Sequence, residues 1–185
     1  MLFSIGYATK PIDVFIEQLQ HHGIAVIADV RSVPYSNVFA DYRQENLIVS
    51  LKNAGIKYVY LGDELGPRSK DAAHYDDNNQ VQFDRLAKSQ LFKQGVERLQ
   101  RGVNAGFDIA LMCAEKDPAT CHRSLLVAYY LEREKGIAVQ HIDHTGNLES
   151  QAQLEARLVS IQNLAPDLLS SKEELEKIAY QSQLK

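Results

Sequence analysis

The chain of 185 residues is long enough for a substantial core and short enough for one domain, or one domain with an appendage. Apolar residues make up 45% and charged residues 24%, which excludes disorder as the dominant state. The net charge is −4 and no basic run occurs, so charge does not support nucleic acid as a partner. Two cysteines, no expected secretory signal and no apolar run near the ~18 residues of a membrane helix predict a cytoplasmic protein without a membrane contact.

Strands and helices are predicted to alternate along most of the chain. Each predicted strand is a short apolar run bounded by glycine or by a helical stripe, and these runs lie at 2–7, 24–30, 56–61, 108–113 and 137–142. Helices are predicted between them at 11–22, 47–54, 83–101 and 121–135. This order predicts an α/β fold: a mostly parallel central sheet of about five strands with helices on both faces.

The end of the chain is predicted to be a helical extension, at 146–185, of an α/β domain formed by 1–145. A helix is expected at 147–162 and a linker at 163–170. A last helix is expected to follow, because Ser171 and Glu174 have the spacing of a capping box. The sequence does not define the role of this last helix or the oligomeric state.

Residues suited to chemistry follow all five predicted strands. Ligands of open parallel sheets bind outside the carboxyl ends of the strands, so these residues are expected to gather at one edge. In chain order they are Gly6, Tyr7, Arg31, Ser36, Arg68, Cys113, Glu115, Cys121, His122, Arg123, His141 and His144. Their clustering predicts a ligand site at that edge.

The densest segment runs from Cys113 to Arg123. Cys113 ends a strand and Cys121 opens a helix, whose dipole favours a thiolate, so Cys121 is expected to have the lower thiol pKa. One interpretation makes Cys121 or Cys113 a nucleophile or redox thiol, with Glu115 and His122 in proton transfer. The alternatives are a buried core residue for Cys113 and a solvated loop carboxylate for Glu115.

Three arginines after strands predict an anionic ligand, such as a phosphate or a nucleotide. The residues predicted to bind it are Gly6, Tyr7, Arg31, Ser36, Arg68 and Arg123. Arg31 and Arg123 are expected to meet in one pocket, and a salt bridge is the alternative for Arg123. Asp29, near the end of a buried strand, is expected to orient an arginine or backbone amides, since a buried charge needs a partner.

Metal binding by the thiols and histidines is a further alternative. His141 and His144 are candidates to join Cys113, Cys121 and His122, and these residue types suit zinc. The spacing lacks the close ligand pairs of structural zinc sites, so no metal ligand is assigned, and the sequence identifies no cofactor.

Several short motifs occur together and in one order. They are Ile5-Gly6-Tyr7, Asp29-Val30-Arg31, Gly55-Ile56-Lys57-Tyr58, Leu61-Gly62, Cys113-Ala114-Glu115 and Cys121-His122-Arg123. Through them the chain, from about Leu2 to His144, resembles the bacterial domain-of-unknown-function family 488. The resemblance implies an α/β fold and an active site, but no reaction, because none is firmly assigned to that family. Where the family commonly has a second glycine before the arginine, this chain has Pro67.

These observations predict an enzyme, a cysteine-dependent transferase or hydrolase, that binds a small anionic or nucleotide-like substrate. Two alternatives stay open: a non-catalytic module that binds a nucleotide or nucleic acid, and a Cys/His metal-binding protein.

Overall fold

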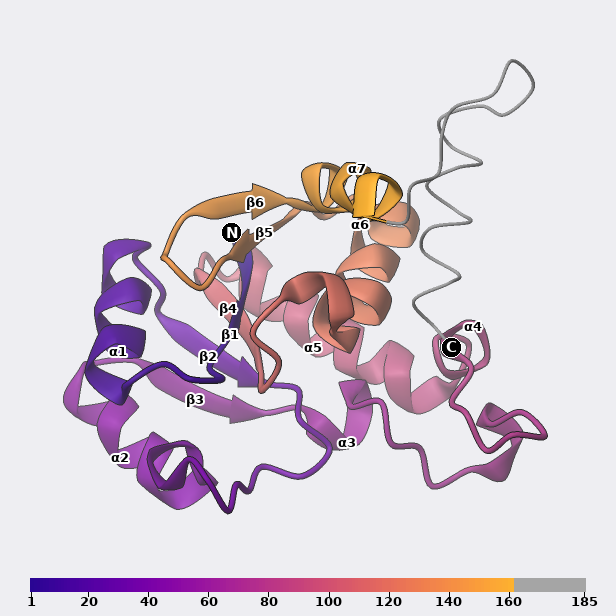
Figure 1. Ribbon diagram of the computed structural model, residues 1–185, viewed down its shortest axis with the longest axis horizontal. Coiled ribbons are helices and arrows are strands. Elements are labelled where there is room, and N and C mark those ends of the chain that lie inside the picture. The colour runs from indigo at the N-terminus through magenta and orange to yellow at the C-terminus, as the bar shows by residue number, and fades with distance from the viewer. Residues whose placement is uncertain (162–185) are drawn as a thin grey trace.

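The computed structural model describes residues 1–161 and is built around a six-stranded sheet with the order β3-β2-β4-β1-β5-β6 (Figure 1). The strands are β1 (Leu2–Gly6), β2 (Val26–Asp29), β3 (Lys57–Tyr60), β4 (Ile109–Cys113), β5 (Val139–Ile142) and β6 (Leu148–Ser150). The first five are parallel, and β6 pairs antiparallel with β5 at one edge. The predicted α/β fold with a mostly parallel sheet is confirmed.

Helices cover both faces of the sheet, as predicted (Figure 1). The longer ones are α1 (Ile12–His21), α2 (Gln44–Asn53), α5 (Gln90–Asn104), α6 (Tyr129–Lys135) and α7 (Gln151–Ile161). Short ones lie in the connections: η1 (Ala40–Tyr42), α3 (Gly62–Leu65), η2 (Ala72–His74), α4 (Phe83–Leu86), η3 (Pro118–Thr120) and η4 (Arg123–Ala128). Phe15 of α1 and Leu47 of α2 share one core, whereas Phe92 of α5 and Leu131 of α6 belong to the core on the other face.

The parallel register brings the carboxyl ends of five strands to one edge. The last Cα pairs of the ladders are Gly6–Cys113, Ile5–Ile142, Asp29–Met112 and Asp29–Tyr60. β4 lies between β1 and β2, which are followed by helices on one face, whereas β4 is followed by helices on the other. Such a reversal opens a crevice at the strand ends, where ligands of open α/β sheets bind.

The helix predicted at 147–162 begins later, because Leu148–Ser150 forms β6. The Asp143 carboxylate accepts hydrogen bonds from the N–H groups of Thr145 and Asn147, and Gly146 adopts a φ of 94°, so the chain turns back directly after β5. A reciprocal pair of hydrogen bonds between Ser150 and Gln153 then starts α7.

The helix predicted at 83–101 is divided into α4 and α5. Ser89 starts α5, since its hydroxyl accepts a hydrogen bond from the N–H of Phe92 at 3.2 Å. The linker at 163–170 and the last helix predicted from the sequence lie outside the described residues. In the described part of the chain, no helix has the length and apolar content needed to cross a membrane.

A buried row of hydrogen bonds ties α7 to the sheet. Ser4 Oγ lies 2.7 Å from His141 Nδ1, and His141 Nε2 lies 2.7 Å from Gln151 Oε1. Because the amide oxygen only accepts, Nε2 carries the ring proton and Nδ1 accepts from the Ser4 hydroxyl. His141 has no exposed surface, and burial lowers its pKa from 6.5 to about 4.

His141 should make the fold sensitive to acid. Between pH 6.5 and about 4 the imidazole is protonated in the unfolded chain and neutral in the folded one, so stability falls as the pH falls through this window. From pH 7 to 4, the free energy of unfolding should drop by up to about 3 kcal/mol more in the wild type than in His141→Gln. Urea denaturation of both proteins at each pH measures this difference, and an identical pH dependence would contradict it.

Candidate functional site

Two thiols, an imidazole and a carboxylate meet beyond the carboxyl end of β4. The sulfurs of Cys113 and Cys121 donate to Glu115 Oε2 at 2.8 and 3.0 Å. The same sulfurs lie 3.6 and 3.8 Å from His122 Nδ1, and all four ligating atoms lie within 4.8 Å of one another. The structure therefore brings together the four residues that the sequence suggested as a catalytic group, a cluster we call the thiol cluster.

A short turn returns the chain to the end of β4. Asp117 starts η3 by accepting a hydrogen bond from the N–H of Ala119 at 2.9 Å, and η3 ends directly before Cys121. The helix that follows opens with η4, a π-helical segment, and such segments are rare and frequent at functional sites. This turn places Cys121 beside Cys113, although seven residues separate them in the chain.

One hydrogen bond fixes the orientation of His122. Its Nε2 lies 2.9 Å from the carbonyl oxygen of Val30, the residue that follows β2. Because a carbonyl only accepts, Nε2 carries the proton, and Nδ1 presents its lone pair to the two sulfurs. Metal-ligating histidines are held in this way, through the nitrogen that does not bind the metal.

The cluster is buried except at the carboxylate. Cys113, Cys121 and His122 are 3%, 1% and 6% exposed, whereas Glu115 is exposed. The cluster therefore meets solvent on the side of Glu115.

The two thiols differ in their electrostatic environment. Burial alone would raise the pKa of the Cys121 thiol, but the hydrogen bond with Cys113 and the positive charge of Arg123 hold it well below its ordinary value, and His122 lowers it further when its ring is protonated. The hydrogen bond with Cys121 and burial raise the pKa of the Cys113 thiol. Cys121 therefore has the lower thiol pKa, the order expected from the sequence, with the hydrogen bond from Cys113 as the main lowering cause and the Arg123 charge as the next.

The spacing of the cluster fits a zinc ion. In a tetrahedral site with Zn–S near 2.3 Å and Zn–N near 2.1 Å, a sulfur and a nitrogen ligand are about 3.6 Å apart. The corresponding distances here are 3.6 and 3.8 Å. The nitrogen–sulfur distances therefore match zinc-ligand spacing, and the exposed Glu115 carboxylate lies beside both sulfurs.

His141, considered from the sequence as a further metal ligand, binds Ser4 and Gln151 instead. Neither His141 nor His144 belongs to the cluster within the described residues. The contribution of the Val30 carbonyl was missed, because no side chain signals it in the sequence.

Arg31 is paired with Asp29. Its Nε and Nη2 donate to the two carboxylate oxygens at 2.9 and 2.6 Å, and its Nη1 donates to the Tyr42 carbonyl at 2.7 Å. This confirms that Asp29 orients an arginine, and it leaves the expected role of Arg31 as an anion ligand without support. The pair instead secures the chain directly after Val30, whose carbonyl holds His122.

Arg123 holds the backbone of the loop that carries Glu115. The guanidinium is fully buried and donates to the carbonyl oxygens of Glu115 and Lys116 at 2.8 and 3.4 Å. Gly6 makes room for this arrangement, since a Cβ at that position would lie 1.9 Å from the Glu115 carbonyl oxygen. Arg123 and Gly6 therefore position Glu115, and the expected pocket between Arg31 and Arg123 gains no support from these contacts.

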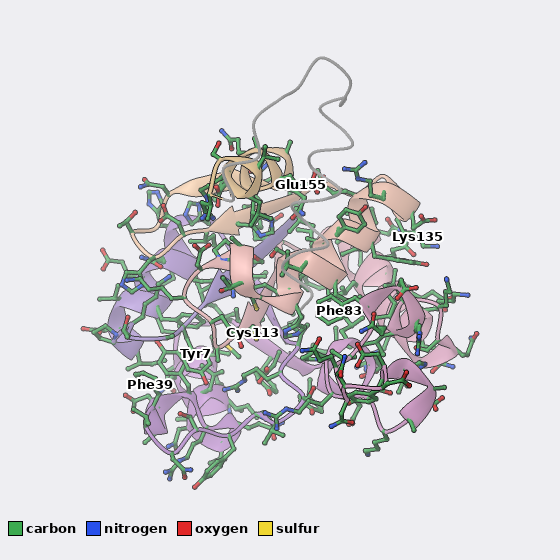
Figure 2. The ribbon with its side chains drawn as sticks, turned by 45° about the vertical axis from the view of Figure 1, so that its right-hand side comes forward. Tyr7, Phe39, Phe83, Cys113, Lys135 and Glu155 are labelled. Carbon is green, nitrogen blue, oxygen red and sulfur yellow. The ribbon has the colours of Figure 1, made fainter. Side chains whose placement is uncertain are left out.

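Of the other residues expected to bind an anion, Tyr7 lies next to the cluster, since its N–H donates to the Cys113 carbonyl at 3.2 Å. Tyr7 is buried and packs edge-on against Phe39 with ring centroids 5.9 Å apart, and both lie on the same side of Cys113 in Figure 2. The Ser36 hydroxyl accepts a hydrogen bond from the Phe39 N–H at 2.9 Å. The side chain of Arg68 is exposed.

The cluster loop is also tied to α7. Arg157 donates to both carboxylate oxygens of Asp117, at 2.9 and 2.8 Å, and to both of Glu149, at 2.8 and 2.9 Å. The hydrogen bonds from Arg157 hold the pKa of Asp117 below its ordinary value. Contacts from beyond residue 145 therefore support the loop between the two cysteines.

Comparison with known proteins places the chain in a family. The model of the family described as domain of unknown function DUF488 matches residues 11–130, a range that contains the whole thiol cluster. No curated protein and no solved structure matches the chain. Because the family match spans more than half of the chain, the protein belongs to the DUF488 family.

Proposed function

We propose that the protein is a zinc-dependent enzyme in which Cys113, Cys121 and His122 bind the metal and Glu115 acts on a water molecule at the fourth position. The observation that carries this proposal is the position of His122 Nδ1, 3.6 and 3.8 Å from the two sulfurs, with its Nε2 held by Val30. Two cysteines and one histidine with an open position are a known catalytic zinc set.

Burial favours a ligand role of the thiols over a nucleophilic one. Cys121 is 1% exposed, so a substrate atom has no path to its sulfur in this conformation. A zinc ion bound to both thiolates would instead present an open position on the side of the exposed Glu115. The low pKa of the Cys121 thiol agrees with this role, because a ligand must lose its proton.

The arrangement supports hydrolysis with Glu115 as the group that transfers protons. Glu115 Oε2 lies beside both sulfurs, within reach of a water molecule at the fourth position. In the proposed reaction, the water O–H bond breaks and its proton passes to the Glu115 carboxylate, while the oxygen forms a bond to the substrate. The bond between the substrate and the leaving group breaks, and the leaving group departs with the proton that Glu115 returns. A zinc ion held by Cys113, Cys121 and His122 would stabilise the negative charge that develops.

The purified protein should contain about one zinc ion per chain, as measured by plasma mass spectrometry. Cys121→Ser and His122→Ala should lose most of the metal, because each removes one of only three buried ligands. His21→Ala is the matched control, since His21 is an exposed histidine on α1. A His122→Ala protein that keeps its full zinc content would contradict the proposal.

Alkylation of the thiols separates the ligand role from the nucleophile role. In the zinc-loaded protein, iodoacetamide should label both cysteines slowly, and removal of zinc by a chelator should make Cys121 the faster one, because it has the lower pKa. Fast labelling of Cys121 in the zinc-loaded protein would instead favour a cysteine nucleophile.

Glu115→Gln should lower the hydrolysis of 4-nitrophenyl acetate at least about a hundredfold, because the amide accepts no proton from water. Its zinc content should stay at the wild-type level, which separates loss of proton transfer from loss of the metal. Glu97→Gln, an exposed glutamate on α5, should change neither quantity. An unchanged rate in Glu115→Gln would remove Glu115 from the reaction.

A further inference from the structure

An exposed aromatic side chain lies in the loop that leads away from the thiol cluster. Val33, Tyr35 and Val38 are 53%, 52% and 80% exposed, and they are three of the ten large apolar side chains exposed among the described residues. Tyr35 is the aromatic member of that exposed set. Single exposed apolar residues are ordinary, but three within six positions of one loop form a patch that suits a ligand.

This patch lies at the sheet edge that carries the cluster. The loop begins directly after Val30, whose carbonyl holds His122. The Arg68 N–H donates to Ser32 Oγ at 3.0 Å, which joins the loop after β2 to the segment that follows α3. In Figure 1 both segments run along the lower side of the molecule, beyond the tips of β2 and β3.

One arginine packs on the exposed ring, and a second lies on the segment joined to its loop. The guanidinium carbon of Arg43 lies 4.8 Å from the centroid of the Tyr35 ring, and its Nε donates to the Ser36 carbonyl at 2.9 Å. The side chain of Arg68 is exposed. Among the described residues, neither arginine forms an ion pair with a carboxylate. Arg43 therefore carries a charge beside the ring that no carboxylate takes up, and Arg68 carries another on the adjoining segment.

We infer that Tyr35, Arg43 and Arg68 bind one nucleotide unit as the substrate of the neighbouring centre. An exposed ring backed by a guanidinium stacks on a planar base, and an unpaired arginine binds a phosphate. Two cations suit a single unit better than a long strand, in agreement with the net charge of −4 and the absence of a basic run. The inference rests on the proposed function, because the nucleotide would be the substrate of the reaction proposed for the thiol cluster.

Binding of two probes to the zinc-loaded protein tests the role of the ring. The probes are thymidine 5′-monophosphate, followed by calorimetry, and a fluorescein-labelled thymidine oligomer of about eight nucleotides, followed by anisotropy. Tyr35→Ala should weaken binding about tenfold, whereas Tyr35→Phe should bind like the wild type because it keeps the ring. Leu91→Ala, which changes an exposed apolar residue of α5, is the matched control.

The role of Arg68 is tested by the salt dependence of the same binding. Arg68→Gln should weaken binding at least about threefold at low salt and reduce the slope of affinity against salt concentration, because one phosphate contact is lost. Arg101→Gln, an exposed arginine on α5, should leave both unchanged. Comparable affinity for the two probes identifies a free nucleotide as the ligand, and binding of the oligomer alone identifies the end of a single strand.

Failure to bind either probe, or binding that Tyr35→Ala leaves unchanged, would overturn the inference. The zinc content of the same samples keeps this outcome apart from failure of the proposed function. A protein that holds zinc but binds neither probe refutes the nucleotide site alone. A protein that binds a probe through Tyr35 but takes up no zinc refutes the metal centre alone.

Discussion

The hydrogen bond between His122 and the Val30 carbonyl is the contact on which the geometry of the site depends. Without it, the imidazole could rotate and Nδ1 would lose its position between the two sulfurs. The bond forms because β2 is the direct neighbour of β4, so the residue after β2 lies beside the loop after β4. The Asp29–Arg31 pair then holds the chain on the far side of Val30. Strand order and one buried ion pair thus combine to orient a single ring.

Two buried arginines at the carboxyl edge of the sheet, Arg31 and Arg123, have specific hydrogen-bond partners. Arg31 has the Asp29 carboxylate, and Arg123 has two backbone carbonyls of the loop that carries Glu115. Burial of a guanidinium is costly unless its N–H groups are bonded, so both arginines constrain the backbone segments they contact, although the buried Nε of Arg123 has no hydrogen-bond partner among the described residues. They position the thiol cluster, and Arg123 also supplies positive potential that favours the Cys121 thiolate, which is a different role from the binding of an external anion.

The sequence predicted the parallel sheet because its strands are short apolar runs, and it therefore also predicted which residues gather at the carboxyl edge. It did not predict β6, since three residues carry too little periodicity to be distinguished from the start of a helix. The sequence also did not predict the partners of Arg31 and Arg123, because these contacts depend on side-chain direction and on backbone carbonyls. The approach of the two cysteines was hidden for the same reason: seven residues between them give no signal until η3 folds the loop back.

The loop that carries the thiol cluster is held by more hydrogen bonds than the loop around Tyr35, and under the proposed function this difference suits catalysis. Between Cys113 and Cys121, the loop is bound by Arg123 from one side and by Arg157 through Asp117 from the other. These contacts hold the backbone that carries the two sulfurs and Glu115. The loop around Tyr35 instead exposes three apolar side chains. Among the described residues, neither Arg43 nor Arg68 forms an ion pair with a carboxylate. A tightly held thiol cluster therefore lies beside a loop with exposed side chains, and under the proposed function this arrangement separates recognition of the substrate from the bond that reacts.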